Sequence, residues 1–396
     1  MKLRQLSLKL HRYVGIMVGL LLVAIALTGS ILVFHEEIDR YLNPQVMQVV
    51  PQIESEKQTL SDRKSPDFVF NKVRSAYPEL TLRIIHLPME ADGVYKVGLE
   101  SKTEEWFDVY INPYSGVILG TKQWGRTLIT FIYDIHLTLL AGDFGEKVVG
   151  VCGFLLVLLA VTGLILWPGW KKLGTGFKIR WQAPTHLLNY DIHKVAGIWS
   201  VVFLVMIAFT GAGLIFYTEF EGAVYWLTRT PPPPTLTSTL QADKAPLALD
   251  EILQKADVAL PGAKTTFVNI PNKPDGVVRV TKKFPQEVKP SGRSRVFVDQ
   301  YSGKVLRVEN ALEAPLPNRF LDSLFPLHTG IYGGLATRII HVFIGLTPTG
   351  LFITGFVMWR QQQWAKARRK EDIRHSQKVL ACRDENGYWM NEWPWF

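Results

Sequence analysis

The sequence predicts an α-helical integral membrane protein, in which a duplicated two-span unit gives four transmembrane helices and two small α+β domains outside the membrane. Three observations lead to this fold class. Four apolar stretches are long enough to cross a hydrocarbon core of about 30 Å. The mean hydropathy of +0.10 is too low for a chain that consists of membrane spans alone. Segments from the first half of the chain also recur in the second half.

The composition limits the classes of protein that remain. The 396 residues are 47% hydrophobic, and the net charge is +9. A basic balance can indicate nucleic-acid binding, but here the basic residues gather at the ends of the apolar stretches, where they indicate membrane topology. We therefore expect a lipid bilayer and no nucleic acid as a partner. The only two cysteines, Cys152 and Cys382, exclude a disulfide framework and a Cys-x-x-Cys metal site.

The four predicted spans cover residues 13–34, 148–167, 195–217 and 338–359. The first is longer than the apolar region of about 7–15 residues in a signal peptide, so we expect it to remain as a span. Lysine and arginine cluster before span one, after span two and after span four. Because such clusters stay in the cytoplasm, both termini are expected inside, in the inner membrane of a bacterial cell.

An internal repeat organises the chain, with the two copies in parallel orientation. Each copy contains a span, an external domain, a short amphipathic helix and a second span. The matched segments include "LHRYVGI" at 10–16 with "IHKVAGI" at 192–198, and "IYDIHLTLLAG" at 132–142 with "LFPLHTGIYGG" at 324–334. The predicted parts are the N-terminal segment and span one (1–35), the first periplasmic domain (36–125), an interfacial helix and span two (126–170), a cytoplasmic loop and span three (171–217), the second periplasmic domain (218–319), an interfacial helix and span four (320–360), and a cytoplasmic tail (361–396).

Each external domain begins with a helical pattern, at 66–80 and at 247–262, and continues with alternating strands. A hairpin with the turn "NPYSG" or "DQYSG" follows in each copy. Within the membrane, a Thr-Gly step recurs in all four spans, at 28–29, 162–163, 210–211 and 354–355. Small residues there allow close helix packing, and they would also leave room for the edge of a flat cofactor.

Six of the nine histidines lie in the spans or their approaches. They are His11, His35, His136, His193, His328 and His341. His11 and His193 are repeat mates, as are His136 and His328. The 24 residues from His11 to His35 correspond to about 36 Å of helix, so the six histidines fall into an inner level (His11, His193) and an outer level with the other four.

Three interpretations of these histidines are open. They could bond to lipid head groups and backbone, they could form a small metal site, or they could hold b-type haem from facing helices. A small metal site usually needs carboxylates or thiolates, of which the spans offer few. Imidazoles, small residues and aromatic side chains together favour haem. The natural inner pair is His11 with His193. The outer pair could be His35 with His341 or His136 with His328. An asymmetric outer site, or only one site of that kind, is preferred because Tyr217 stands at the repeat position of His35.

The remaining histidines, His86, His186 and His375, are expected to be ordinary loop or tail residues. No Ser/His/Asp or paired-carboxylate set suggests hydrolysis.

With these motifs in hand, the chain resembles the PepSY-associated transmembrane family. The resemblance rests on "LHRYVG", "TGSILVFHEEIDRYLNP", "IHLTLLAGDFGEKVVG", "TGLILWP", "YDIHKVAGIW" and the two PepSY-like hairpins, and it extends to about residue 360. It implies an inner-membrane oxidoreductase that holds two haems b and reduces a ferric siderophore or other ferric chelate in the periplasm, with the six histidines as iron ligands. The tail after residue 360 has no Gly-rich dinucleotide loop, so a separate electron donor, a quinol or a cytoplasmic flavin reductase, is expected.

The expected activity is electron transfer to the ferric chelate, which releases Fe(II) for iron uptake. The alternative is a protein without enzymatic activity, either a component of iron or siderophore transport or a PepSY-type regulatory module of the membrane. A haem protein should show a Soret band, whereas a transporter should move labelled chelate without any electron donor.

Overall fold

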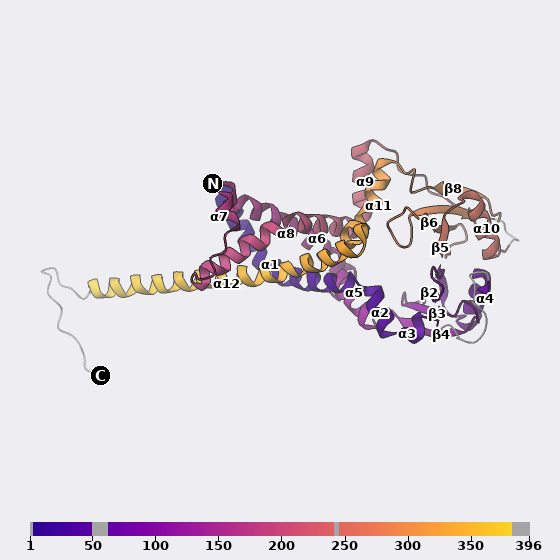
Figure 1. The fold of residues 1–396 in the computed structure, drawn as a ribbon, viewed down its shortest axis with the longest axis horizontal. Helices are drawn as coiled ribbons and strands as arrows, with labels where there is room; N and C mark the ends of the chain where they lie inside the picture. The colour runs from indigo at the N-terminus through magenta and orange to yellow at the C-terminus, as the bar shows by residue number, and fades with distance from the viewer. Residues whose placement is uncertain (1–2, 50–61, 241–244, 382–396) are drawn as a thin grey trace. The chain divides into compact units, whose positions relative to one another are not determined.

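A computed structural model describes residues 3–49, 62–240 and 245–381. Four of its helices are long and apolar enough to cross a membrane, which confirms the four predicted spans. These helices are labelled in Figure 1. They are α1 (Leu3–Leu32), α6 (Gly142–Leu166), α8 (Thr185–Ile215) and α12 (Gly334–Ala381).

The helices are longer than the apolar stretches in the sequence. Both α1 and α8 begin eight residues before their histidines, so His11 and His193 lie within helices rather than at span ends. Helix α1 ends at Leu32, and a new helix, α2 (His35–Leu42), begins at His35 itself. Helix α12 continues through the predicted tail to Ala381. The rest of that tail, 382–396, lies outside the described residues.

The chain divides into two compact units. The first comprises Met1–Val23, Leu155–Val205 and Leu346–Phe396, and the second comprises Ala24–Phe154 and Met206–Gly345. The boundaries fall within the four long helices rather than at the predicted domain limits. The first unit also holds the short segments η2 (Pro168–Trp170) and α7 (Leu173–Phe177).

The second unit contains all eight described strands and the remaining helices. The helices are α3 (Pro44–Met47), α4 (Pro66–Ala76), α5 (Leu128–Thr138), α9 (Tyr217–Thr228), α10 (Leu249–Ala259), α11 (Leu316–Thr329) and the turn η3 (Ile331–Gly333). The strands are β1 (Thr81–His86), β2 (Tyr95–Glu100), β3 (Trp106–Ile111), β4 (Ile118–Gln123), β5 (Lys264–Asn269), β6 (Val277–Lys283), β7 (Ser294–Asp299) and β8 (Val305–Glu309). The order helix, four strands, helix therefore occurs twice, as the repeat predicts.

The strands form one antiparallel sheet in the order β4-β3-β2-β1-β5-β6-β7-β8. This differs from the expectation of two separate small domains. Strands β1 and β5 are each the first strand of a four-stranded meander, and they pair antiparallel, with Ile85 opposite Val268. Left apart, each would present a row of unpaired backbone N–H and C=O groups at an edge. Their pairing joins the two meanders into one continuous sheet.

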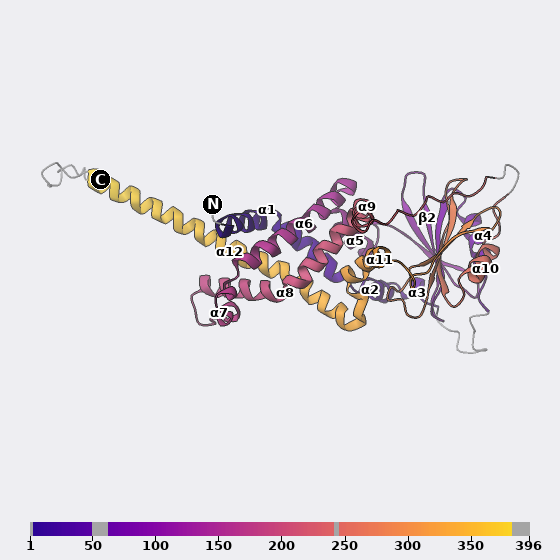
Figure 2. The same ribbon diagram turned by 90° about the horizontal axis from the view of Figure 1, so that it is seen from above.

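Helices α4 and α10 cover one face of this sheet, as Figure 2 shows. Alternate strand residues point to this face, and they form the hydrophobic core with the two helices. Val73 of α4 and Ala256 of α10 are fully buried there. The predicted hairpin turns are also present: the Asn112 and Asp299 side chains accept backbone N–H bonds from the residues that follow them.

Candidate functional site

Two histidines from different spans face each other in the first unit. The rings of His11 on α1 and His193 on α8 have centroids 6.1 Å apart and are nearly perpendicular. Nδ1 of His11 lies 3.0 Å from the Leu159 carbonyl oxygen and 3.0 Å from Oγ1 of Thr162. Nδ1 of His193 lies 2.9 Å from Oγ1 of Thr354. We call these two residues the α1–α8 histidine pair.

A second pair, built in the same way, lies in the second unit. The rings of His136 on α5 and His328 on α11 also have centroids 6.1 Å apart. Nδ1 of His136 lies 2.8 Å from the Ile25 carbonyl oxygen, and Nδ1 of His328 lies 2.9 Å from that of Ile207. We call these residues the α5–α11 histidine pair. The residues that form each pair belong to a single unit.

The hydrogen bonds fix the protonation of all four rings. A carbonyl oxygen only accepts, so Nδ1 of His11, His136 and His328 must carry the proton. The hydroxyl of Thr354 already donates to the Gly350 carbonyl, so it accepts from His193 in turn. Nε2 of each neutral ring then keeps a lone pair. In the described part of the chain, none of these Nε2 atoms makes a hydrogen bond, so all four can bind a metal ion.

The glycines of the Thr-Gly steps make room for these rings. A methyl group added at Gly29 would lie 2.8 Å from Cε1 of His136, and one added at Gly211 would lie 2.7 Å from Cε1 of His328. A methyl group added at Gly163 would lie 3.1 Å from Cε1 of His11, and one added at Gly355 would lie 3.5 Å from Cε1 of His193. Each Thr-Gly step therefore contacts one histidine of another helix, so the steps do more than allow helix packing.

A cavity of about 640 Å³ adjoins the α1–α8 histidine pair. All four long helices contribute to its wall, within the first unit. Most lining side chains are apolar, and Trp167 and Trp359 are among them. The basic side chains of Arg4 and Arg12 also line it. Its volume lies within the range of about 300–1,000 Å³ that is usual for small-molecule sites, and it has the wide apolar walls that a large flat cofactor needs.

The other two predicted ligands lie elsewhere. Nδ1 of His35 lies 2.8 Å from the carbonyl oxygen of Leu32, and its ring packs edge-on against Tyr133. Both ring nitrogens of the buried His341 lie 2.9 Å from carbonyl oxygens, those of Thr337 and Leu327. His341 therefore has no ring nitrogen directed toward open space. The geometry favours His136 with His328 over the asymmetric outer site that the sequence suggested.

A small metal site finds little support in the arrangement. Among the described residues, no group of three or more His, Cys, Asp or Glu side chains converges as metal ligands would. Each site instead offers two imidazoles from different helices, with ring centroids 6.1 Å apart. Histidine side chains from facing helices would be able to hold the iron of a b-type haem. The donor set therefore fits haem.

The sequence indicated the four paired histidines but not the groups that hold them. The carbonyl oxygens of Ile25, Leu159 and Ile207 leave no mark in the sequence, because every residue has one. The recurrence of Thr-Gly was the available signal, and its assignment to particular histidines required the packing of the helices.

Comparison with known proteins agrees with this architecture. The family model described as the PepSY-associated TM region matches residues 8–362. Uncharacterized protein PA4219 of Pseudomonas aeruginosa is 24% identical to the chain over 265 residues, which are 59% of the chain and 64% of that protein. The chain thus spans less than two thirds of this curated relative. Because the family model covers most of the sequence, the chain belongs to the family of the PepSY-associated TM region, a family of multi-pass membrane proteins.

Proposed function

We propose that the protein is an inner-membrane haem b protein that passes electrons to a ferric siderophore or similar ferric chelate in the periplasm, releasing Fe(II) for uptake. The observation that carries the proposal is the geometry of the two histidine pairs. In each pair the ring centroids lie 6.1 Å apart, and Nδ1 of each ring is hydrogen-bonded to a backbone carbonyl or a threonine hydroxyl, which leaves Nε2 without a hydrogen bond in the described part of the chain.

The spacing suits one metal ion between two rings. A histidine nitrogen binds a metal at about 2 Å, so two such bonds bring the ring centroids to about 6 Å apart. When bound, haem b would supply one-electron redox chemistry. His11 and His193 would hold one haem, and His136 and His328 a second. The Nδ1 bonds fix the tautomer and raise the basicity of Nε2.

The walls of the first site support the same proposal. Apolar side chains around a haem exclude water, and burial is one of the factors that set its reduction potential. The guanidinium groups of Arg4 and Arg12 line the same cavity and can pair with the carboxylates of a haem. Helix α1 carries His11 of one site and Thr28–Gly29 of the other, so a single helix contributes to both.

The overall reaction balances with a separate donor. Each ferric ion takes up one electron and becomes Fe(II), whose lower charge weakens its attraction to oxyanion donors. A quinol gives two electrons and releases two protons, so its oxidation reduces two ferric ions. A cytoplasmic flavin reductase is the other class of donor. The residues of this chain bind and insulate the redox centre, and no acid–base side chain is required.

The test is the absorption spectrum of the full-length protein purified from haem-replete cells. We expect a Soret band that shifts on addition of dithionite, and about two haems per chain. H11A and H193A should each lose about half of the haem, as should H136A and H328A. H341A is the matched control, and it should keep the wild-type haem content because each ring nitrogen of His341 lies 2.9 Å from a backbone carbonyl oxygen.

Two results would contradict the proposal. One is a colourless, haem-free protein from haem-replete cells. The other is uptake of labelled ferric chelate into vesicles without any electron donor, which would favour a transport component instead.

A further inference from the structure

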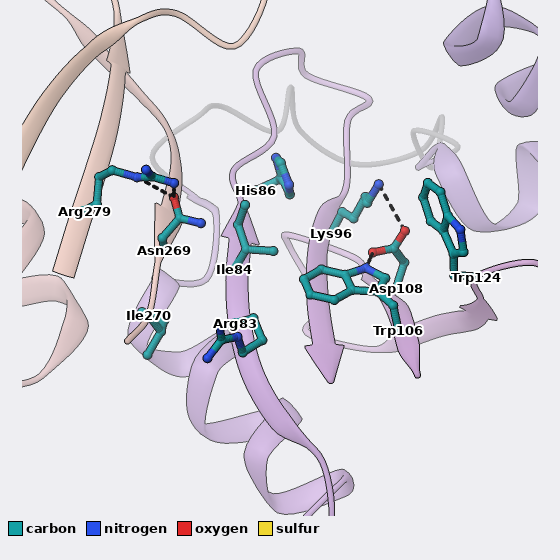
Figure 3. A pocket seen from close by; sticks show the side chains of 10 residues that line it. All are labelled: Arg83, Ile84, His86, Lys96, Trp106, Asp108, Trp124, Asn269, Ile270 and Arg279. Carbon is teal, nitrogen blue, oxygen red and sulfur yellow. Dashed lines mark hydrogen bonds and ion pairs between the residues drawn. The ribbon is translucent and has the colours of Figure 1, made fainter. Parts of the chain in front are cut away.

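The face of the sheet opposite α4 and α10 holds a pocket of about 490 Å³. Figure 3 shows the side chains that line it. Most come from strands β1, β2 and β3 of the first meander and from β5 and β6 of the second, while Trp124 directly follows β4 and Ile270 directly follows β5. The pocket therefore spans the junction between β1 and β5, and pairing of the two meanders creates it.

Strand alternation brings the polar residues to this face. Ile84 pairs with Gly98 on one side and with Asn269 on the other, and Asn269 pairs with Arg279. Directly paired residues share a face, so these positions form one row across the junction. The neighbouring residue Ile85 points to the other face and is fully buried in the core.

The charges in the pocket are only partly balanced. Lys96 pairs with Asp108 at 3.1 Å, and the same carboxylate accepts a hydrogen bond of 2.9 Å from Nε1 of Trp106. Arg279, by contrast, donates to Oδ1 of Asn269 at 3.1 and 2.9 Å, and this amide is neutral. No carboxylate is hydrogen-bonded to Arg279 among the described residues. Its positive charge is therefore available to a ligand.

A second arginine, Arg83, also lines the pocket. Arg83 forms an ion pair with Glu100 through Nε at 3.2 Å. Its buried Nη1 atom has no hydrogen-bond partner among the described residues. The Arg83 side chain as a whole is 28% exposed and lines the pocket, so the accessible part of its guanidinium group can donate to a ligand there. His86 adds no charge near neutral pH, since burial lowers its pKa to about 4 and the charge of Lys96 acts in the same direction.

Two indole rings complete the lining, those of Trp106 and Trp124. Trp106 lies against Gly98, and a methyl group there would be 2.3 Å from Cζ2 of the indole. The absence of a side chain at Gly98 thus lets the ring rest on the strand. Aromatic rings favour offset or edge-on packing with other aromatic rings. The pocket therefore combines donors for oxyanions with surfaces for flat rings.

We propose that this pocket binds a ferric chelate whose iron donors are aromatic oxyanions, namely phenolate or catecholate groups. The choice of a ferric complex rests on the function proposed above. Arg279 and Arg83 pair with the oxyanions, and the indoles pack against the aromatic rings. A neutral, aliphatic hydroxamate complex would use neither feature. The volume is within the range of about 300–1,000 Å³ for small-molecule sites.

The test uses gallium(III), which replaces ferric iron but is not reduced. Full-length protein in lipid nanodiscs is titrated calorimetrically with the gallium complex of 2,3-dihydroxybenzoate. We expect saturable binding that R279Q weakens about tenfold or more, because a charge-assisted hydrogen bond is lost. R279K keeps the charge without the planar fork and should weaken binding less. W106L should also weaken binding.

The matched control is K255Q. Lys255 lies on α10, which covers the opposite face of the sheet, and pairs with Glu251, so the variant removes the same charge without touching the pocket. Its affinity should equal that of the wild type. Equal affinities for R279Q and K255Q, or tighter binding of gallium acetohydroxamate, would overturn the inference. Since gallium binding needs no haem, a haem-free protein that still shows the Arg279 dependence would contradict the proposed electron transfer and support the pocket.

Discussion

Each of the four paired histidines contacts a Thr-Gly step on a neighbouring helix. The threonine hydroxyl lies 3.0 Å from Nδ1 in the case of His11 and 2.9 Å in the case of His193. It lies 3.3 Å away for His136 and 3.5 Å for His328. The glycine leaves space for the ring in every case. The same local arrangement, one histidine against one Thr-Gly step of another helix, therefore occurs four times among the described residues.

The glycines allow a graded test at the scale of single residues. A new methyl group would lie 2.7 Å from the His328 ring in G211A and 2.8 Å from the His136 ring in G29A, closer than carbon atoms approach without displacement. Both variants should move the ring and lose about half of the bound haem. In G355A the closest ring atom is 3.5 Å away, an ordinary contact, so haem content should stay near that of the wild type. Soret absorbance per protein measures the difference.

The haem contents of G29A, G211A and G355A, compared with one another, test whether the glycines make room for the histidine rings. Loss of haem in G355A with retention in G29A and G211A would show that the Thr-Gly steps serve helix packing rather than the histidines.

At the scale of elements, the first turns of α4 and α10 cap each other. Oδ1 of Asp67 accepts a hydrogen bond of 2.9 Å from the backbone N–H of Leu249, at the start of α10. Oδ1 of Asp250 accepts one of 3.0 Å from the N–H of Asp67. Helix α10 has Ala248 before it, which offers no side-chain acceptor. One backbone N–H at the start of α10 is therefore satisfied by a residue 182 positions earlier in the chain.

These two hydrogen bonds predict that removal of either carboxylate destabilises the folded protein. D67A and D250A should each lower the free energy of unfolding by about 1 kcal/mol, the usual cost of losing a capping acceptor. The decrease is measured as a lower melting midpoint of tryptophan fluorescence in nanodiscs.

D67N is the matched control, since asparagine retains the accepting oxygen and caps equally well. Its midpoint should stay close to that of the wild type. If D67N were as destabilised as D67A, the carboxylate charge rather than the hydrogen bond would be responsible.

At the scale of the whole molecule, four spans among the described residues lead us to expect both ends of the chain on the same side of the membrane. The basic clusters before α1, after α6 and along the end of α12 lead us to expect that side to be the cytoplasm. The strands lie in the segments between α1 and α6 and between α8 and α12, so they should lie outside.

Cysteine labelling tests this orientation. In a chain with Cys152 and Cys382 replaced by serine, S115C and S302C place thiols on exposed hairpin turns. A membrane-impermeant maleimide should label both in intact spheroplasts. It should label K172C only after the membrane is disrupted. The reverse pattern would place the sheet in the cytoplasm and contradict the proposed reduction of an external chelate.

The sequence predicted the elements that depend on neighbouring residues. Length and apolarity reveal a span within about 20 residues, and alternation reveals a strand. The four spans, the helices α4 and α10, and the turns at Asn112 and Asp299 were all predicted in this way. The helix limits were not: α1 and α8 extend into polar sequence, which hydropathy alone cannot mark as helical.

Only the tertiary structure determined which residues that are distant in the sequence lie close together. His136 and His328 are 192 positions apart in number, and either outer pairing was compatible with the repeat. Helix packing placed their rings 6.1 Å apart and left a carbonyl oxygen 2.9 Å from each ring nitrogen of His341. In the same way, only strand pairing showed that β1 and β5 join two meanders and bring Arg279 beside the first one. Local periodicity fixes which face a residue occupies, whereas its partner depends on backbone hydrogen bonds and packing across the whole chain.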